Sequence, residues 1–151
     1  MPDILDASFV SMTKTKNMKL IVYTDGGSRG NPGPSGCGIF IVDTEGNCVE
    51  KRFKYIGIAT NNIAEYTAGL LGITRSIELG ATEIELRADS QLMIEQLSGN
   101  YKVKNIELKK IWLSIHEHIS NWWGNVTFTH VFREQNIEAD RLSNVAMDRR
   151  E

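Results

Sequence analysis

Cysteine and proline are scarce in this chain of 151 residues, which contains only two cysteines and three prolines. No group of cysteine and histidine residues has the spacing of a zinc site, so a zinc-stabilised module is not expected. No apolar run approaches the roughly 20 residues of a membrane span, and the N-terminus lacks the apolar segment of a secretory signal. These absences favour a cytoplasmic protein whose fold depends on an ordinary hydrophobic core.

An excess of positive charge is also missing, because 19 acidic residues outnumber 17 basic ones. Passive nucleic-acid-binding proteins usually show a basic footprint, so this balance argues mildly against that class. It leaves open an enzyme that holds cations between itself and phosphate. The length fits one domain, which we expect over residues 18–151. Residues 1–17 show no sustained hydrophobic period and are interpreted as a flexible leader.

The two cysteines, Cys37 and Cys48, flank a predicted turn at Glu45-Gly46. Counting back from this turn places Cys37 opposite a residue near Lys54 rather than opposite Cys48. We therefore expect no disulfide between the two cysteines, and we expect both to be buried free thiols.

Apolar runs predict five strands, and apolar positions at helical spacing predict four helices. Glycine and proline fill most positions from Gly26 to Gly36, so this stretch is expected to be a loop. Asn61-Asn62 is expected to cap the long helix. The strands are expected at residues 19–24, 37–42, 49–58, 84–88 and 126–132, and the helices at 61–79, 91–97, 106–122 and 137–147.

This order of elements predicts an α/β fold. Short turns favour antiparallel pairing of the first three strands. The long helix between the third and fourth strands implies a right-handed crossover. We expect a mixed five-stranded sheet in the order 3-2-1-4-5, flanked by helices, with strand 1 central and parallel to strand 4.

Two aspartates follow apolar strands of this sheet. Asp25 comes after the run 19–24, and Asp89 comes after the run 84–88. If these strands are parallel neighbours, the two carboxylates lie side by side at the carboxyl edge, where open α/β sheets place their ligands. Asp140 lies near the start of the last helix, at the edge of its buried face.

A third carboxylate, that of Glu65, lies in the first turn of the long helix. Gly69, Gly72 and Ser76 follow it on the same stripe. Glycine weakens a helix interior by about 1 kcal/mol relative to alanine, so two of them suggest a close approach of helix to sheet. Such an approach would hold the Glu65 side chain over the end of strand 1.

Clustered carboxylates repel one another unless one is protonated or a cation neutralises them. Oxygen ligands of this kind suit Mg²⁺ or Mn²⁺, and two such ions can promote hydrolysis of a phosphodiester. A simpler interpretation remains open for each residue taken alone. An aspartate at a strand end often caps a turn or helix, and the helix dipole favours a glutamate in the first turn.

Four segments resemble the motifs of type 1 ribonuclease H. They are Y-T-D-G-G-S-R-G-N-P-G-P-S-G at Tyr23–Gly36, T-N-N-I-A-E-Y at Thr60–Tyr66, A-D-S-Q at Ala88–Gln91, and N-I-E-A-D-R-L-S at Asn136–Ser143. They occur in the order of the family and cover about residues 18–148. The chain looks like the compact archaeal-like or bacterial branch, which lacks a basic protrusion.

The resemblance implies an endonuclease that cuts the RNA strand of an RNA–DNA hybrid. Asp25, Glu65, Asp89 and Asp140 match the catalytic and metal-binding positions, where two Mg²⁺ ions, or Mn²⁺ as a substitute, would act. The products would carry 5′-phosphate and 3′-hydroxyl ends. The hybrid duplex is the implied partner, and we expect a monomer without an obligatory protein partner.

The resemblance also implies substrate contacts. Asn61, Asn62 and Gln91 match positions that touch the minor groove of the hybrid, where the 2′-hydroxyl distinguishes RNA from DNA. Asn31 and Thr60 match positions near the pocket that grips a DNA phosphate. The competing explanation is that these polar residues stabilise turns or cap helices.

Two departures from the family are visible. The loop before the last helix is shorter than usual and lacks the family's histidine, so Arg133 is the candidate substitute. The place of the missing basic protrusion has four lysines nearby, which form either a small basic patch or a solvated helix face: Lys102, Lys104, Lys109 and Lys110.

Two alternative functions remain open: a non-catalytic binding module on the same fold, or another nuclease of the superfamily.

Overall fold

The computed structural model describes residues 17–151, so the leader predicted for residues 1–17 lies outside the described residues except for Asn17. None of the helices in this range combines the length and apolar character that crossing a membrane requires. The elements, in chain order, are β1 (Lys19–Ser28), β2 (Gly33–Val42), β3 (Cys48–Ala59), α2 (Asn61–Glu78), β4 (Glu83–Ala88), α3 (Gln91–Leu97), α4 (Ile106–Ser120), β5 (Asn125–His130), the short 3₁₀ helix η1 (Arg133–Gln135) and α5 (Ile137–Arg149).

The five strands form one sheet in the order β3-β2-β1-β4-β5, which confirms the predicted fold class and strand order. β1 pairs with β2, and β2 with β3, in antiparallel register. β4 pairs in parallel with β1 and with β5. β1 is therefore the central strand, and the carboxyl ends of β1 and β4 meet at one edge of the sheet.

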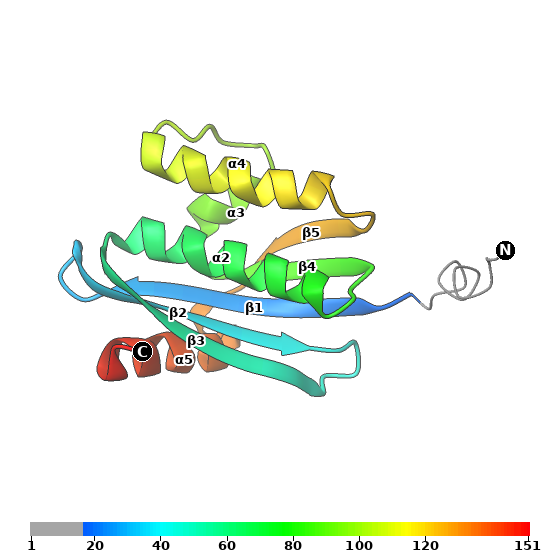
Figure 1. The fold of residues 1–151 in the computed structure, drawn as a ribbon, viewed down its shortest axis with the longest axis horizontal. Coiled ribbons are helices and arrows are strands. Elements are labelled where there is room, and N and C mark those ends of the chain that lie inside the picture. The colour runs from blue at the N-terminus through cyan, green and yellow to red at the C-terminus, as the bar shows by residue number, and fades with distance from the viewer. Residues whose placement is uncertain (1–16) are drawn as a thin grey trace, which may run out of the picture.

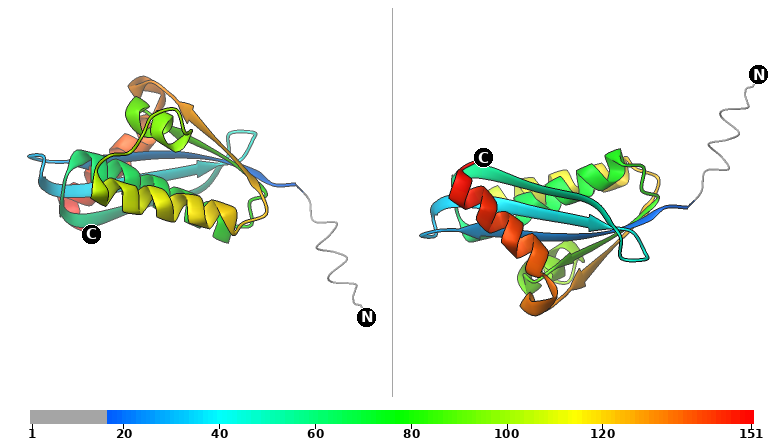
Figure 2. Two further views of the ribbon diagram at one scale, coloured as in Figure 1. Left: turned by 90° about the horizontal axis from the view of Figure 1, so that it is seen from above. Right: turned by 90° about the horizontal axis from the view of Figure 1, so that it is seen from below.

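Helices cover both faces of the sheet (Figure 1). On one face α2 packs against β1 and β2, and α4 packs on α2 as an outer layer. On the other face α5 lies across β1, β2 and β3, as the view from below shows (Figure 2). The main core fills the space beneath α2, where Val22, Ile41, Ile73, Leu86 and Ile115 are fully buried.

The glycine- and proline-rich stretch is mostly strand, so the prediction of a loop over Gly26–Gly36 is wrong. β1 continues to Ser28 and β2 begins at Gly33, which leaves a connection of four residues. Local propensity favours turns here, but packing overrides it, because both faces of these strands are approached closely by backbone. A Cβ atom at Gly26 would lie 2.2 Å from the carbonyl carbon of Ala64 in α2.

α5 packs against the glycines of β2. A Cβ atom at Gly38 would lie 2.1 Å from the carbonyl oxygen of Ala139 and 2.6 Å from the amide nitrogen of Ser143. At Gly36 it would lie 2.8 Å from the carbonyl oxygen of Ser143. Only glycine allows this separation of helix and sheet. The packing brings the first two turns of α5 against the strand that neighbours β1.

The hairpin register confirms one prediction about the cysteines and corrects another. Cys37 pairs with Lys54 across β2 and β3, and both cysteines are free thiols. Cys37 is buried, as predicted, but Cys48 is exposed at the start of β3. The reason for the difference is position, because Cys48 is the first residue of β3, beside the exposed hairpin turn.

Candidate active site

Asp25 and Asp89 are neighbours at the junction of β1 and β4. The parallel register runs to the pair Thr24 and Ala88, and the two aspartates are the next residue on each chain. Asp25 is nevertheless inside β1, paired with Gly38 of β2, because β1 extends beyond the apolar run. The topology thus places one buried and one half-buried carboxylate side by side.

Glu65 reaches the same point from α2. Its Oε1 accepts a hydrogen bond from the Gly26 amide at 3.1 Å. The predicted close approach of helix to sheet occurs at Gly72, where a Cβ atom would lie 2.8 Å from Thr24 Cγ2. It does not occur at Gly69, whose Cβ would meet only the Met93 and Ile115 side chains at ordinary contact distances. α2 therefore packs directly on β1 at Gly72, and the bond between Gly26 and Glu65 joins its N-terminal part to the same strand.

One carboxylate oxygen each from Asp25, Glu65 and Asp89 lies within 4.8 Å of the others. Asp25 and Glu65 are both only 7% exposed. Burial, and then the charge of Asp89, raises the pKa of Asp25 from 3.8 to about 7. Burial, followed by the charges of Asp25 and Asp89, raises the pKa of Glu65 well above its usual 4.5. The cluster is thus electrostatically strained unless protons or cations compensate it.

Asp140 approaches this cluster from α5 but is not one of its three closest members. Its side chain is exposed in the first turn of the helix. It still contributes to the raised pKa of Asp25, through its charge and through a hydrogen bond between the two carboxyl groups. Of the four predicted carboxylates, three converge tightly and the fourth flanks Asp25 on the solvent side.

Asn136, just before α5, also belongs to the site. Sequence patterns did not predict its role. Its side chain is 1% exposed. Nδ2 donates to the Thr24 carbonyl oxygen at 3.0 Å and to Asp89 Oδ2 at 3.3 Å. The only available signal was its place at the start of the N-I-E-A-D motif.

Four of the predicted substrate-binding residues line one surface hollow of about 500 Å³. Asn31, Thr60, Asn61 and Asn62 surround it together with residues at the start of α4. Thr60 is the N-cap of α2, and its hydroxyl accepts from the Ile63 amide at 3.2 Å, so the prediction of Asn61-Asn62 as caps is wrong. Thr60 has the extended backbone of a cap, whereas the asparagines are already helical.

Asn31 takes part in the same helix end, because its Oδ1 accepts a hydrogen bond from the Asn61 amide at 2.8 Å. The hollow therefore lies at the positive ends of two helices, α2 and α4, which favours an anionic ligand. Gln91 lies elsewhere, exposed at the first residue of α3 and two residues after Asp89.

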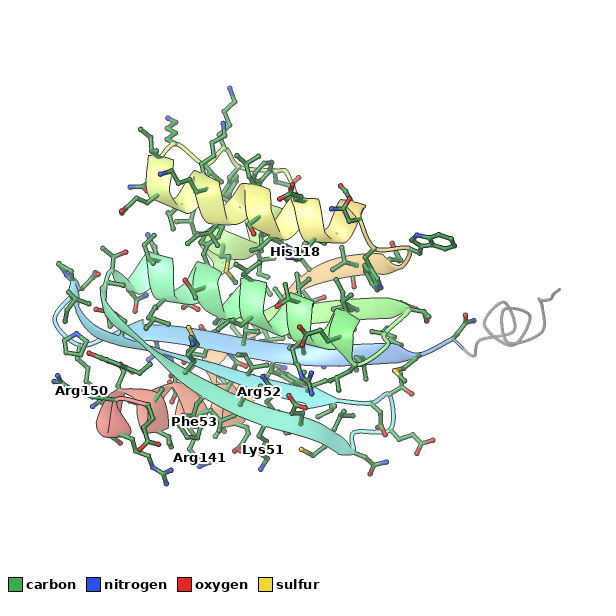
Figure 3. All side chains as sticks on the ribbon, in the orientation of Figure 1. Lys51, Arg52, Phe53, His118, Arg141 and Arg150 are labelled. Atoms are coloured by element: carbon green, nitrogen blue, oxygen red, sulfur yellow. The ribbon has the colours of Figure 1, made fainter. Side chains whose placement is uncertain are left out.

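Arg133 is close enough to the carboxylates for its charge to act on Glu65. It is exposed in η1, and its charge lowers the pKa of Glu65 against the larger effects of burial. Lys51 and Arg141 lie on β3 and α5 (Figure 3), where both form ion pairs with Glu138, at 2.9 and 2.7 Å. His118 lies on α4 in the outer helical layer, so it does not replace the missing loop histidine.

This site provides oxygen ligands only, in a partly buried cluster that carries excess negative charge. Hard divalent cations such as Mg²⁺ and Mn²⁺ prefer such ligands. Asp25, Glu65 and Asp89 therefore fit a divalent metal centre, with Asp140 beside it at the surface.

Comparison with known proteins supports this interpretation. A family model described as Reverse transcriptase-like matches residues 23–146. A bifunctional protein of Mycobacterium tuberculosis is 41% identical over 132 residues, which are 87% of this chain and 36% of that protein. The ribonuclease HI of Halobacterium salinarum is 39% identical over 126 residues, 83% of this chain and 63% of that protein. The chain thus spans about a third to two thirds of the length of these relatives.

Among solved structures, LC11-RNase H1 from compost, in complex with an RNA/DNA hybrid, has a TM-score of 0.84 and 41% identity. The match covers 87% of this chain and 98% of that one. The shared topology, the converging carboxylates and these similarities agree, and the chain belongs to the type 1 ribonuclease H family.

Proposed function

We propose that this chain is an endonuclease that hydrolyses the RNA strand of RNA–DNA hybrids. In this proposal, two Mg²⁺ ions are held by Asp25, Glu65, Asp89 and Asp140, and the products carry 5′-phosphate and 3′-hydroxyl ends. The observation that carries it is the convergence of three carboxylates from three separate elements to within 4.8 Å. A relative with 41% identity is described in complex with an RNA/DNA hybrid.

The cluster is suited to cations rather than to acid–base catalysis alone. Burial and mutual repulsion raise the pKa of Asp25 and of Glu65, so ionisation of both beside Asp89 is disfavoured unless a cation compensates the charge. When bound, two divalent cations activate water and stabilise the leaving oxygen of a phosphodiester. Mn²⁺ is expected to substitute, because it accepts the same ligands.

The protein groups divide the remaining tasks. Asp25, Glu65 and Asp89 hold the centre, and the Gly26 amide and Asn136 orient two of these carboxylates. The exposed Asp140 stands where substrate enters. Arg133 faces the same centre and can contact a substrate phosphate, which is the role proposed in place of the missing histidine.

Recognition of the hybrid is proposed for two surfaces. Asn61, Asn62 and Gln91 carry amides that donate and accept, as contact with a 2′-hydroxyl and base edges requires. Asn31 and Thr60 line the hollow at the ends of α2 and α4, which suits a phosphate of the DNA strand. In their capping bonds both side chains act as acceptors, so the Thr60 hydroxyl hydrogen and the Asn31 Nδ2 hydrogens can donate to phosphate oxygens.

A cleavage panel tests the proposal. Labelled RNA–DNA hybrid, double-stranded RNA, double-stranded DNA and single strands are incubated with Mg²⁺, Mn²⁺ or EDTA. Internal cuts in the RNA of the hybrid, absent in EDTA, are expected, with 3′ ends that a ligase or polymerase can use. Binding without cutting would favour a non-catalytic module, and trimming from ends or cutting of DNA junctions would favour another nuclease class.

Substrate recognition needs its own variants. Asn62→Ala and Gln91→Ala are expected to raise the KM for hybrid with little change in kcat at saturating Mg²⁺. Asn100→Ala is the matched control, because the Asn100 side chain donates to Glu95 Oε1 outside the site. Equal KM values for all three would remove these residues from the proposed interface.

Sedimentation of the intact chain tests the predicted monomer.

A further inference from the structure

Ser143 of α5 is buried beside Asp25 and has no part in the roles assigned above. It is 1% exposed, and it follows Asp140 by almost one helical turn. Its hydroxyl oxygen lies 3.1 Å from Asp25 Oδ2 and 2.9 Å from the backbone carbonyl oxygen of Asp140. Because a hydroxyl has one hydrogen, it can donate to only one of these acceptors at a time.

The Asp25 carboxylate is the favoured acceptor. Hydrogen bonds to an ionised group are roughly twice as strong as those between neutral groups. The carbonyl of Asp140 already receives the side-chain amide of Asn144 at 2.9 Å. When Asp25 is ionised, the Ser143 hydroxyl is therefore expected to point at Oδ2.

The backbone holds this contact rigidly. Asp25 and Gly38 are directly opposite in the β1–β2 pair, so their side-chain positions share a face of the sheet. A Cβ atom on Gly38 would lie 2.6 Å from the Ser143 amide nitrogen. Ser143 thus stands directly over the strand pair that carries Asp25.

We propose that Ser143 is a positioning residue that fixes the Asp25 carboxylate for divalent cation binding. It donates to Oδ2 from the side of α5 and thereby restrains the orientation of the carboxylate that faces Glu65 and Asp89. This inference rests on the proposed function, because it assigns a role within the same metal centre. Groups that orient metal ligands in this way typically change metal affinity or activity by about 10–100-fold when they are removed.

The test compares Ser143→Ala with Ser76→Ala. Ser76 is also fully buried, but its hydroxyl donates to the Gly72 carbonyl within α2, away from the carboxylates. Mg²⁺ and Mn²⁺ affinity is measured without substrate by isothermal titration calorimetry and by the rise in Tm on adding metal. Cleavage of hybrid is then measured across Mg²⁺ concentrations for the same proteins.

Ser143→Ala is expected to bind the metals about tenfold more weakly and to need about tenfold more Mg²⁺ for half-maximal cleavage. At saturating Mg²⁺ its KM for hybrid should equal that of the parent chain. Ser76→Ala should keep the parent metal affinity. Ser143→Thr, which retains the hydroxyl, should restore metal affinity; if its extra methyl prevents folding, the comparison of the two alanine variants decides.

Equal metal affinity and equal Mg²⁺ dependence for Ser143→Ala and Ser76→Ala overturn the role of Ser143, while cleavage by the parent chain leaves the proposed function intact. A parent chain that binds Mg²⁺ but cuts no hybrid overturns the proposed function, and the calorimetric comparison still decides on Ser143. A parent chain that binds no divalent cation overturns both.

Discussion

Asn136 and Asp89 are joined by a hydrogen bond of 3.3 Å between Nδ2 and Oδ2, across 47 positions of the chain. The same amide nitrogen also donates to the carbonyl oxygen of Thr24, at 3.0 Å. One buried side chain, just before α5, thereby connects β1 with the residue that follows β4. The relative placement of Asp25 and Asp89 depends on this connection, since Thr24 directly precedes Asp25 and Asp89 is itself the second partner.

Asn136→Ala tests that dependence. The change leaves the buried Thr24 carbonyl without this donor and frees Asp89, so we expect a loss of about 1–3 kcal/mol in the free energy of unfolding. Cleavage should fall by about 10–100-fold, as for other groups that orient metal ligands. Urea unfolding and initial cleavage rates measure the two effects. The control is Asn121→Ala at the exposed end of α4, where both values should hardly change; an equally mild effect at Asn136 would refute the connection.

Asp25→Asn separates activity from stability. It removes the central carboxylate, so cleavage of hybrid should fall below detection. It also removes a charge from a cluster in which burial and Asp89 raise the pKa of Asp25 to about 7. In EDTA at pH 7.5 we therefore expect the variant to be more stable than the parent by about 1–4 kcal/mol. Denaturant unfolding measures this difference, and a variant that is less stable, or that still cuts at the parent rate, contradicts the assignment.

The pH dependence of stability follows from the same carboxyl groups. The folded chain binds the Asp25 proton up to about pH 7, whereas an unfolded chain releases it near 3.8, so this group favours folding at low pH. That stability is lost as the pH rises from about 4 to about 7, and Glu65 acts in the same direction. The lowered pKa of His116 has the opposite effect, because burial favours its neutral form and so disfavours folding at low pH.

The difference between the parent chain and Asp25→Asn gives the contribution of Asp25 together with its repulsion of Glu65. In EDTA, the stability advantage of the variant should be small at pH 4.5 and should grow up to about pH 7.5, because the folded parent chain loses stability as Asp25 ionises. The contribution of His116 is the same in both proteins and cancels in the difference. Adding Mg²⁺ at pH 7.5 should stabilise only the parent strongly, since bound cations compensate the ionised cluster. An advantage that is constant across this pH range would show that the raised pKa has another origin.

The strand order and the meeting of Asp25 with Asp89 were predictable because they follow from hydrophobic period and connection length. The pairing of Cys37 with Lys54 was predictable for a similar reason, since a short turn sets hairpin register by counting. Hairpin register depends on residues that are near one another in the chain. The strand order and the meeting of the two aspartates depend on a crossover connection, which is almost always right-handed.

The contacts of α5 were not predictable in that way. Asn136 and Ser143 reach Asp89 and Asp25 because α5 packs onto Gly36 and Gly38, and local patterns do not determine where a helix crosses a sheet. Gly36 also belongs to the stretch Gly26–Gly36, for which glycine and proline content wrongly predicted a loop. Glycine indicates a turn when only its own conformation is considered, but here it permits backbone to approach backbone.

The variants Gly38→Ala and Gly69→Ala test whether the close packing of α5 on β2 is needed for stability and for cleavage. The added methyl at Gly38 would lie 2.1 Å from the carbonyl oxygen of Ala139, so α5 must shift away from the sheet. We expect a loss of about 3 kcal/mol or more in unfolding free energy. Since a displacement of about 1 Å can reduce a rate by about 10²-fold, cleavage should fall at least tenfold as Asp140 moves from Asp25.

Gly69 lies inside α2, where the added methyl meets only side chains at 3.7 Å or more. Alanine is the better helix former, so Gly69→Ala should raise the unfolding free energy by about 0.5–1 kcal/mol and leave cleavage near the parent rate. Urea unfolding and Mg²⁺-dependent cleavage of hybrid are measured for both variants. If Gly38→Ala behaved like Gly69→Ala, α5 could not be the element whose close packing sets the geometry of the carboxylates.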